Sequence, residues 1–103
     1  MTIAAKPTRS LTSIAARIGR LPFANLDEES RATLMSWTLA SLKMNPGERA
    51  ISLRMIAATL RKDAQVHDDA DNMSKAALVR KVASDIDAVW QKAEARVEAM
   101  IGS

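Results

Sequence analysis

The chain has 103 residues, enough for one domain with one modest core. Hydrophobic residues make up 48% of it and aromatic residues only 3%, which excludes a disordered chain and leaves Ala, Leu, Ile, Val and Met to build the core. The net charge of +3 is unevenly placed: residues 1–26 carry four basic residues and no acid, whereas residues 27–103 carry 11 basic and 12 acidic residues. The aliphatic palette predicts helices rather than strands, because strands favour β-branched and aromatic residues.

Cysteine is absent, which excludes a disulfide framework and thiol chemistry. It fits a reducing compartment, so we expect a cytoplasmic protein. No apolar run approaches the roughly 20 residues that cross a bilayer, and the first residues have no continuous apolar segment of a signal peptide. We therefore expect no membrane association.

Residues 1–9 are predicted to form a flexible basic leader, and residues 10–103 a single helical domain. The first helix is expected across 10–20, capped by Thr8 or Ser10 and ended by Gly19 and Pro22. Its apolar positions fall on one helical stripe, namely Leu11, Ile14, Ala15, Ile18 and Leu21.

A second helix is expected at about 27–44, capped by Asn25 or Asp27. Its apolar residues lie on two sides: Met35, Leu39 and Leu42 share one face, and Trp37 and Met44 lie nearly opposite. Two apolar faces are typical of a centrally buried helix. The alternative is that the Trp37 and Met44 face docks a partner.

The segment MNPGER predicts a tight corner before a third helix at about 46–62. Asn45 can cap this helix, Pro46 suits its first position, and Glu48 completes a capping box. The polar and acidic residues 63–73 are expected to form the longest internal connection. A long fourth helix should follow from Asn72 or Ser74 to about residue 100.

Residues 46–90 together indicate a helix-turn-helix-like core. The segment SLRMIAATL places Ala57 and Ala58 after Ile56, where a second helix could cross closely. The fold class expected is thus all-α: a compact four-helix domain with a helix-turn-helix-like core and a long C-terminal helix.

SLRMIAATL, followed by a long turn and SKAALVRKVASDI, resembles an extended-turn helix-turn-helix. Such variants occur in transcription regulators and antiactivators of mobile genetic elements such as conjugative elements and phages. The resemblance covers about a third of the chain, and the turn lacks the usual glycine. It implies either a promoter-binding protein or one that binds and blocks an activator.

The leading hypothesis is a small transcription regulator that binds DNA through the N-terminal part of the last helix. The contacts expected on that helix are Lys75, Arg80, Lys81 and Ser84, with Lys6 and Arg9 of the leader on phosphates. Acidic residues in the turn and on the reading helix weigh against it, because binding depends on neutralising phosphates.

The alternative hypothesis is an antiactivator or phage-type inhibitor that binds a regulatory protein and not DNA. Aromatic and Met side chains are frequent centres of such interfaces. The residues expected to serve are Trp37 and Met44, or Trp90, Val97 and Met100 on the last helix. The same last helix could pair with a second copy to form a homodimer.

The sequence offers few candidate catalytic residues. His67 is the only imidazole, and the carboxylate pairs fit helix ends and solvated faces. The segment HDDADN fails the calcium-loop pattern and is expected to be an acidic, solvated turn. We expect no enzyme activity, no catalytic residues, no metal site and no cofactor.

Overall fold

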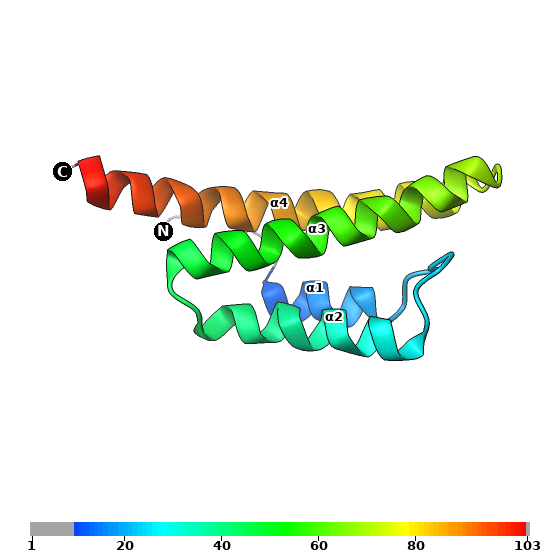
Figure 1. The fold of residues 1–103 in the computed structure, drawn as a ribbon, viewed down its shortest axis with the longest axis horizontal. Coiled ribbons are helices and arrows are strands. Elements are labelled where there is room, and N and C mark those ends of the chain that lie inside the picture. Colours follow the sequence, from blue (N-terminus) through cyan, green and yellow to red (C-terminus); the bar gives the residue numbers. More distant parts are fainter. Residues whose placement is uncertain (1–9, 103) are drawn as a thin grey trace, which may run out of the picture.

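The computed structural model describes residues 10–102, and over that range it is all-α with no strand (Figure 1). The all-α four-helix class predicted from the sequence is confirmed. The expectations for residues 1–9, including Lys6 and Arg9, lie outside the described residues. The elements are helix α1 (Leu11–Ile18), helix α2 (Glu28–Ala40), the short 3-10 helix η1 (Ser41–Lys43), helix α3 (Pro46–Asp69) and helix α4 (Met73–Gly102).

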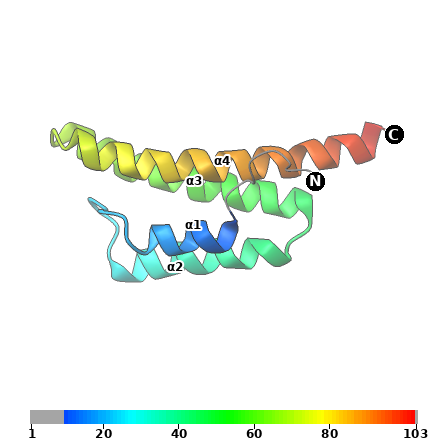
Figure 2. The same cartoon turned by 180° about the vertical axis from the view of Figure 1, so that it is seen from behind.

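The two long helices α3 and α4 run antiparallel and side by side, and the pair α1 and α2 packs along one side of this hairpin (Figures 1 and 2). The 30 residues of α4 span about 45 Å. Its C-terminal end continues past the start of α3 (Figure 1). The core lies where the hairpin meets α1, whose apolar stripe is fully buried.

Alternating alanines explain how closely the long hairpin packs. Buried residues recur at intervals of three and four on α3 and on α4 as far as Ile86, as in an antiparallel coiled coil, and Ala93 follows seven residues later. On α3 they are Ala50, Leu53, Ala57, Leu60, Ala64 and His67, and on α4 they are Ala76, Val79, Ala83, Ile86 and Ala93. Every second position is alanine on α3, so each larger side chain can fill the space that a small neighbour leaves.

Three polar contacts along one edge of the hairpin fix its register. Arg80 donates to Asp68 at 2.5 Å, Arg61 pairs with Asp87, and the guanidinium of Arg54 lies 5.1 Å from the ring centroid of Trp90. The contacts follow one another along the two helices. A slip of either helix by one turn would break all three, whereas each alone contributes little at an exposed edge.

The turn predicted across 63–73 is wrong, because α3 continues to Asp69 and only residues 70–72 connect it to α4. The two helices therefore form a hairpin rather than the steeply crossed pair of an extended-turn helix-turn-helix (Figure 1). The physical reason is burial: Asp63 and His67 are 3% and 4% exposed and face the core, so this polar segment is not a solvated turn.

A Schellman motif ends α3. The N–H of Asn72 donates to the carbonyl of His67 at 2.7 Å, and the N–H of Asp71 donates to that of Asp68 at 3.0 Å. The motif needs a left-handed residue at Asp71, whose φ is 63°. Glycine usually occupies this position, because a Cβ is strained there.

Replacing Asp71 with glycine should therefore raise the free energy of unfolding by about 0.5–1 kcal/mol. Glycine adopts the left-handed backbone without strain, which stabilises the folded state. This stabilisation exceeds the opposing effect of the larger conformational entropy that glycine gives to the unfolded chain. Urea unfolding followed by circular dichroism measures the change. Asp69→Gly is the control, because the same replacement at the last helical residue should destabilise slightly, by about 0.3 kcal/mol. Destabilisation by both variants would contradict the strain argument.

Helix starts follow the predicted capping chemistry. Ser10 caps α1, Asp27 caps α2, and Asn45 with Glu48 forms the capping box of α3. The buried face of α2, however, is not the expected one. Leu39 and Leu42 are 42% and 48% exposed, and the buried face carries Leu34, Thr38 and Ser41 instead.

Hydroxyl groups make this unexpected face possible. The hydroxyl of Thr38 donates to the carbonyl of Leu34 at 2.8 Å, and that of Ser41 donates to the carbonyl of Trp37 at 3.0 Å. Both hydroxyls thus bond to a backbone carbonyl four residues earlier and enter the core without an unpaired donor. Because α2 lies at the edge of the bundle, its other faces, including Trp37, stay open to solvent.

A buried carboxylate holds the loop between α1 and α2 against α3. The side chain of Asp63 accepts from the backbone N–H groups of Ala24 and Asn25 at 2.8 Å each and of Leu26 at 3.3 Å. Nearby, the Nε2–H of His67 donates to the carbonyl of Pro22. These bonds pair loop backbone groups that are not part of a helix.

Candidate functional site

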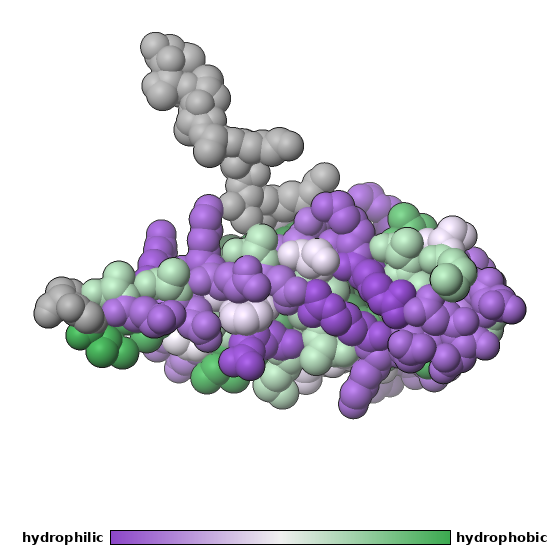
Figure 3. Space-filling view, turned by 90° about the horizontal axis from the view of Figure 1, so that it is seen from above, coloured by the Kyte–Doolittle hydropathy of each residue, from purple (hydrophilic) through white to green (hydrophobic). Residues whose placement is uncertain are grey.

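The structure brings together three of the four α4 residues expected to contact DNA. Arg80, Lys81 and Ser84 follow one another on the outward side of α4, and Lys75 lies in the first turn. The side of the molecule seen in Figure 3 is mostly hydrophilic. Lys75, Lys81 and Ser84 are exposed.

Acidic partners engage both cations of this face. Arg80 donates to Asp68, and Lys81 donates to Asp85 at 3.0 Å. The hydrogen bond raises the pKa of Arg80 and lowers the pKa of Asp68. The carboxylate of Asp68 offsets the charge of Arg80 and engages its Nη2, which leaves fewer donors for a base edge or a phosphate.

Asp85 also joins α4 to the core pair. Burial raises the pKa of Asp85, but hydrogen bonds from Arg17 and Lys81 outweigh it, and the pKa lies below its ordinary value. The bond from Arg17 of α1 measures 2.5 Å. Asp85 therefore supports the docking of α1 on α4, and its negative charge is a fixed part of the α4 surface.

A groove between α2 and α3 gathers three exposed large apolar side chains. Trp37 is 49% exposed, Ile51 62% and Met55 59%, and together with Met44 they line one hollow of about 480 Å³. Trp37 also lines a second hollow with Leu26, Leu34 and Thr59. We call these two hollows, with Trp37 between them, the Trp37 groove.

Acidic residues are the charged members of the groove lining. Glu48 belongs to the hollow beside Met44, and Glu29 to the hollow on the other side of Trp37. No lysine or arginine lines either hollow among the residues that the structure describes. The groove thus combines an apolar centre with negative charge towards both ends.

The structure brings Trp37 and Met44 together as the alternative hypothesis expected, but places the other three residues elsewhere. Trp90 is half-buried, and its indole N–H donates to Asp87 at 2.7 Å. Val97 is half-buried near the start of α3, and Met100 is 74% exposed at the end of α4. These three residues do not line the Trp37 groove.

Ile51 and Met55 were missed by the sequence reasoning. Both lie off the buried stripe of α3, four residues apart, and so share an exposed face with each other. That spacing was the available signal: two large apolar residues on the solvent side of an amphipathic helix. What the sequence could not show is that Trp37 and Met44 lie opposite them.

Between residues 10 and 102 there is no group of three or more His, Asp or Glu side chains placed to hold a metal ion. Within the same range, no helix has the length and hydropathy needed to cross a membrane. His67, the only imidazole of the chain, is buried against Pro22 and lines none of the hollows described above.

Comparison with models of protein families, with curated proteins and with solved structures found no match.

Proposed function

We propose that this protein is a small non-catalytic protein-binding module of the antiactivator or inhibitor type, whose docking site is the Trp37 groove. The observation that carries this proposal is the exposure of Trp37, Ile51 and Met55 around one hollow. Exposed apolar clusters of this kind mark interaction sites, and Trp and Met are frequent anchors.

The occupant we propose is a basic amphipathic helix of a partner protein. The groove lies between two helices, which suits a third helix laid into it. The groove extends from Glu29 to Met44, a length of about 20 Å, which corresponds to three to four helical turns. Because the charged side chains that line the groove among the described residues are acidic, they favour a partner helix with Lys or Arg flanking its apolar face.

Titration with two designed helical peptides tests this proposal. Both carry the same leucine-rich face, but one has lysine flanks and the other glutamate flanks. We expect the lysine peptide to bind at micromolar Kd and at least about tenfold more tightly than the glutamate peptide. Nuclear magnetic resonance measures binding at the indole N–H of Trp37, and the indole of Trp90 serves as an internal control.

The outcomes separate the possible occupants. Shifts at Trp37 alone support the groove, whereas shifts at Trp90 or at the end of α4 would move the docking site there. Equal binding of both peptides would overturn the basic-partner assignment. Lysine-peptide binding that leaves Trp37 unshifted would overturn the groove itself. Concentration-dependent shifts at Met100 without peptide would instead support self-association through the end of α4.

Nucleic-acid binding through α4 is the second candidate function. The exposure of Lys75, Lys81 and Ser84 favours it, because cations on one helix can neutralise phosphates. The pairing of Arg80 with Asp68 is the feature that weakens it. Titration of a labelled mixed-sequence duplex at about 50 and 200 mM salt decides between the candidates, since phosphate-mediated binding falls steeply with salt.

A further inference from the structure

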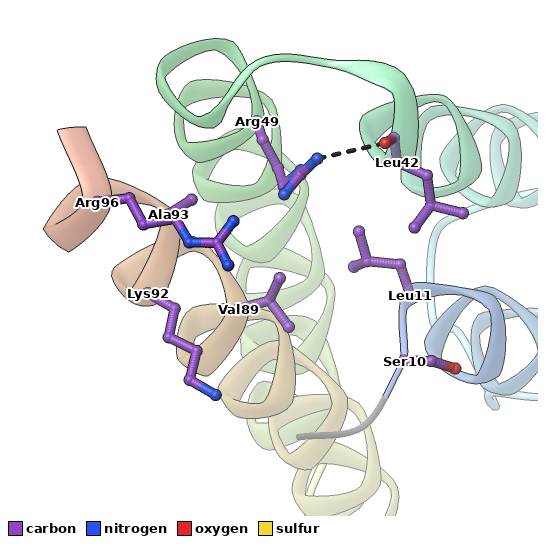
Figure 4. A pocket seen from close by; sticks show the side chains of 8 residues that line it. All are labelled: Ser10, Leu11, Leu42, Arg49, Val89, Lys92, Ala93 and Arg96. Atoms are coloured by element: carbon purple, nitrogen blue, oxygen red, sulfur yellow. Dashed lines mark hydrogen bonds between the residues drawn. The ribbon is translucent and has the colours of Figure 1, made fainter. Parts of the chain in front are cut away.

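A third hollow, separate from the Trp37 groove, lies between α4, the start of α1, η1 and the start of α3 (Figure 4). Its volume is about 300 Å³, at the small end of ligand sites. Three cations line it: Arg49 from α3, and Lys92 and Arg96 from α4. No acidic residue lines it in the part of the chain that the structure describes.

The guanidinium of Arg49 is fixed in place by backbone carbonyls. Its Nε donates to Ser41 at 2.9 Å, and its Nη2 donates to Leu42 at 3.3 Å and to Met44 at 3.0 Å. The remaining nitrogen, Nη1, donates to none of the described residues. A rigid cation with a spare donor is preorganised for an anion, because little conformational entropy is lost on binding.

Arg96 adds a second guanidinium beside the same hollow. Figure 4 shows Arg49 and Arg96 directing their charged ends into the space between α4 and the start of α1. Converging like charges raise the local positive potential, and an anion between them relieves their repulsion. The polar half of a ligand would therefore lie against Arg49 and Arg96.

The remaining lining is apolar. Leu11 and Ala93 are 5% and 3% exposed at the base of the hollow, Val89 is half-buried, and Leu42 stands at its edge. A fully hydrated ion such as inorganic phosphate would leave this surface without a partner. An anion that also carries a short aliphatic chain would cover it and gain the hydrophobic contribution of each buried methylene.

We propose that this hollow binds a small amphiphilic anion, an aliphatic carboxylate whose head group contacts Arg49 and Arg96 and whose chain covers Leu11, Val89 and Ala93. The basic leader of the same chain is a poor occupant, because Lys6 and Arg9 would add positive charge to a cationic hollow. This inference does not depend on the function proposed for the Trp37 groove.

Titrations of the full chain with octanoate, octanol and inorganic phosphate test the assignment. Nuclear magnetic resonance follows the backbone amides from Val89 to Arg96. We expect octanoate to bind with a Kd below about 1 mM and to shift these amides, and the other two probes to bind at least about tenfold more weakly. Equal binding of octanol would show that the cations do not contribute to binding, and equal binding of phosphate would show that the apolar lining does not. Either result would overturn the assignment.

Charge variants supply the second arm of the experiment. The double variant Lys92→Gln/Arg96→Gln should weaken octanoate binding about fivefold to tenfold. The control Lys62→Gln/Lys75→Gln removes the same charge from two exposed lysines outside the hollow and should leave binding unchanged. Equal weakening by both pairs would mean general charge attraction only and would overturn the site. Arg49 stays unaltered, because it also holds the corner between α2 and α3, and thermal unfolding verifies that both variants are folded.

Discussion

Replacing Asp63 with alanine should lower the free energy of unfolding by about 3–4 kcal/mol. The side chain is 1% exposed and accepts three backbone N–H groups of residues 24–26, so its removal leaves three donors without their partner. Each buried donor that loses its bond carries a desolvation cost of about 1–3 kcal/mol, which water entering at the loop reduces. Urea unfolding followed by circular dichroism measures the effect.

The control is Asp69→Ala, six residues later in the same helix. Asp69 is exposed and, among the described residues, accepts from the side chain of Gln65, so its loss should change the free energy of unfolding by less than about 0.5 kcal/mol. A second readout is local: in Asp63→Ala the amides of Ala24 and Asn25 should exchange with solvent much faster. A change of less than about 1 kcal/mol in Asp63→Ala would show that the loop is held by other contacts.

Replacing Trp37 with alanine should separate binding from stability. Trp37 is half-exposed, so we expect the free energy of unfolding to fall by about 1–3 kcal/mol, with the protein still folded. In contrast, the affinity for the lysine-flanked peptide should fall about 30-fold to 100-fold, because a central aromatic anchor contributes about 2–3 kcal/mol to such interfaces. The peptide titration and urea unfolding of the same sample measure the two quantities.

Leu78→Ala is the matched control for this variant. Leu78 is 55% exposed on α4 and does not line the groove, so its truncation should alter neither stability nor peptide binding by much. If Trp37→Ala unfolded the protein, the indole would belong to the core and the docking proposal would fail. If the affinity stayed unchanged, the peptide would bind elsewhere.

Local signals in the sequence predicted the start of each helix well. Asp27 and Asn45 both cap the helices that follow them, and Glu48 completes the capping box at the predicted corner. Such caps form between residues three positions apart, so they can be read without knowing where the rest of the chain lies. The all-α class followed equally directly from the aliphatic composition.

The end of α3 could not be read in this way. Asp63 and His67 have the composition of a turn, yet they continue the spacing of Ile56 and Leu60 on the core face. The available signal was this periodicity, and the polar composition obscured it. With the turn reduced to residues 70–72, the long connection on which the helix-turn-helix resemblance depended is replaced by a short hairpin turn.

The chain's own sequence was sufficient for the helical class, for the caps and for the apolar stripe of α1, because these depend on composition and on neighbours within a few residues. The tertiary structure decided which polar groups are buried and which apolar groups are exposed. Asp63 is tolerated in the core only because its partners, 37 to 39 residues away, fold back onto it. Trp37 stays half-exposed while the neighbouring face with Leu34, Thr38 and Ser41 is buried, because the hydroxyls of Thr38 and Ser41 donate to backbone carbonyls one turn earlier.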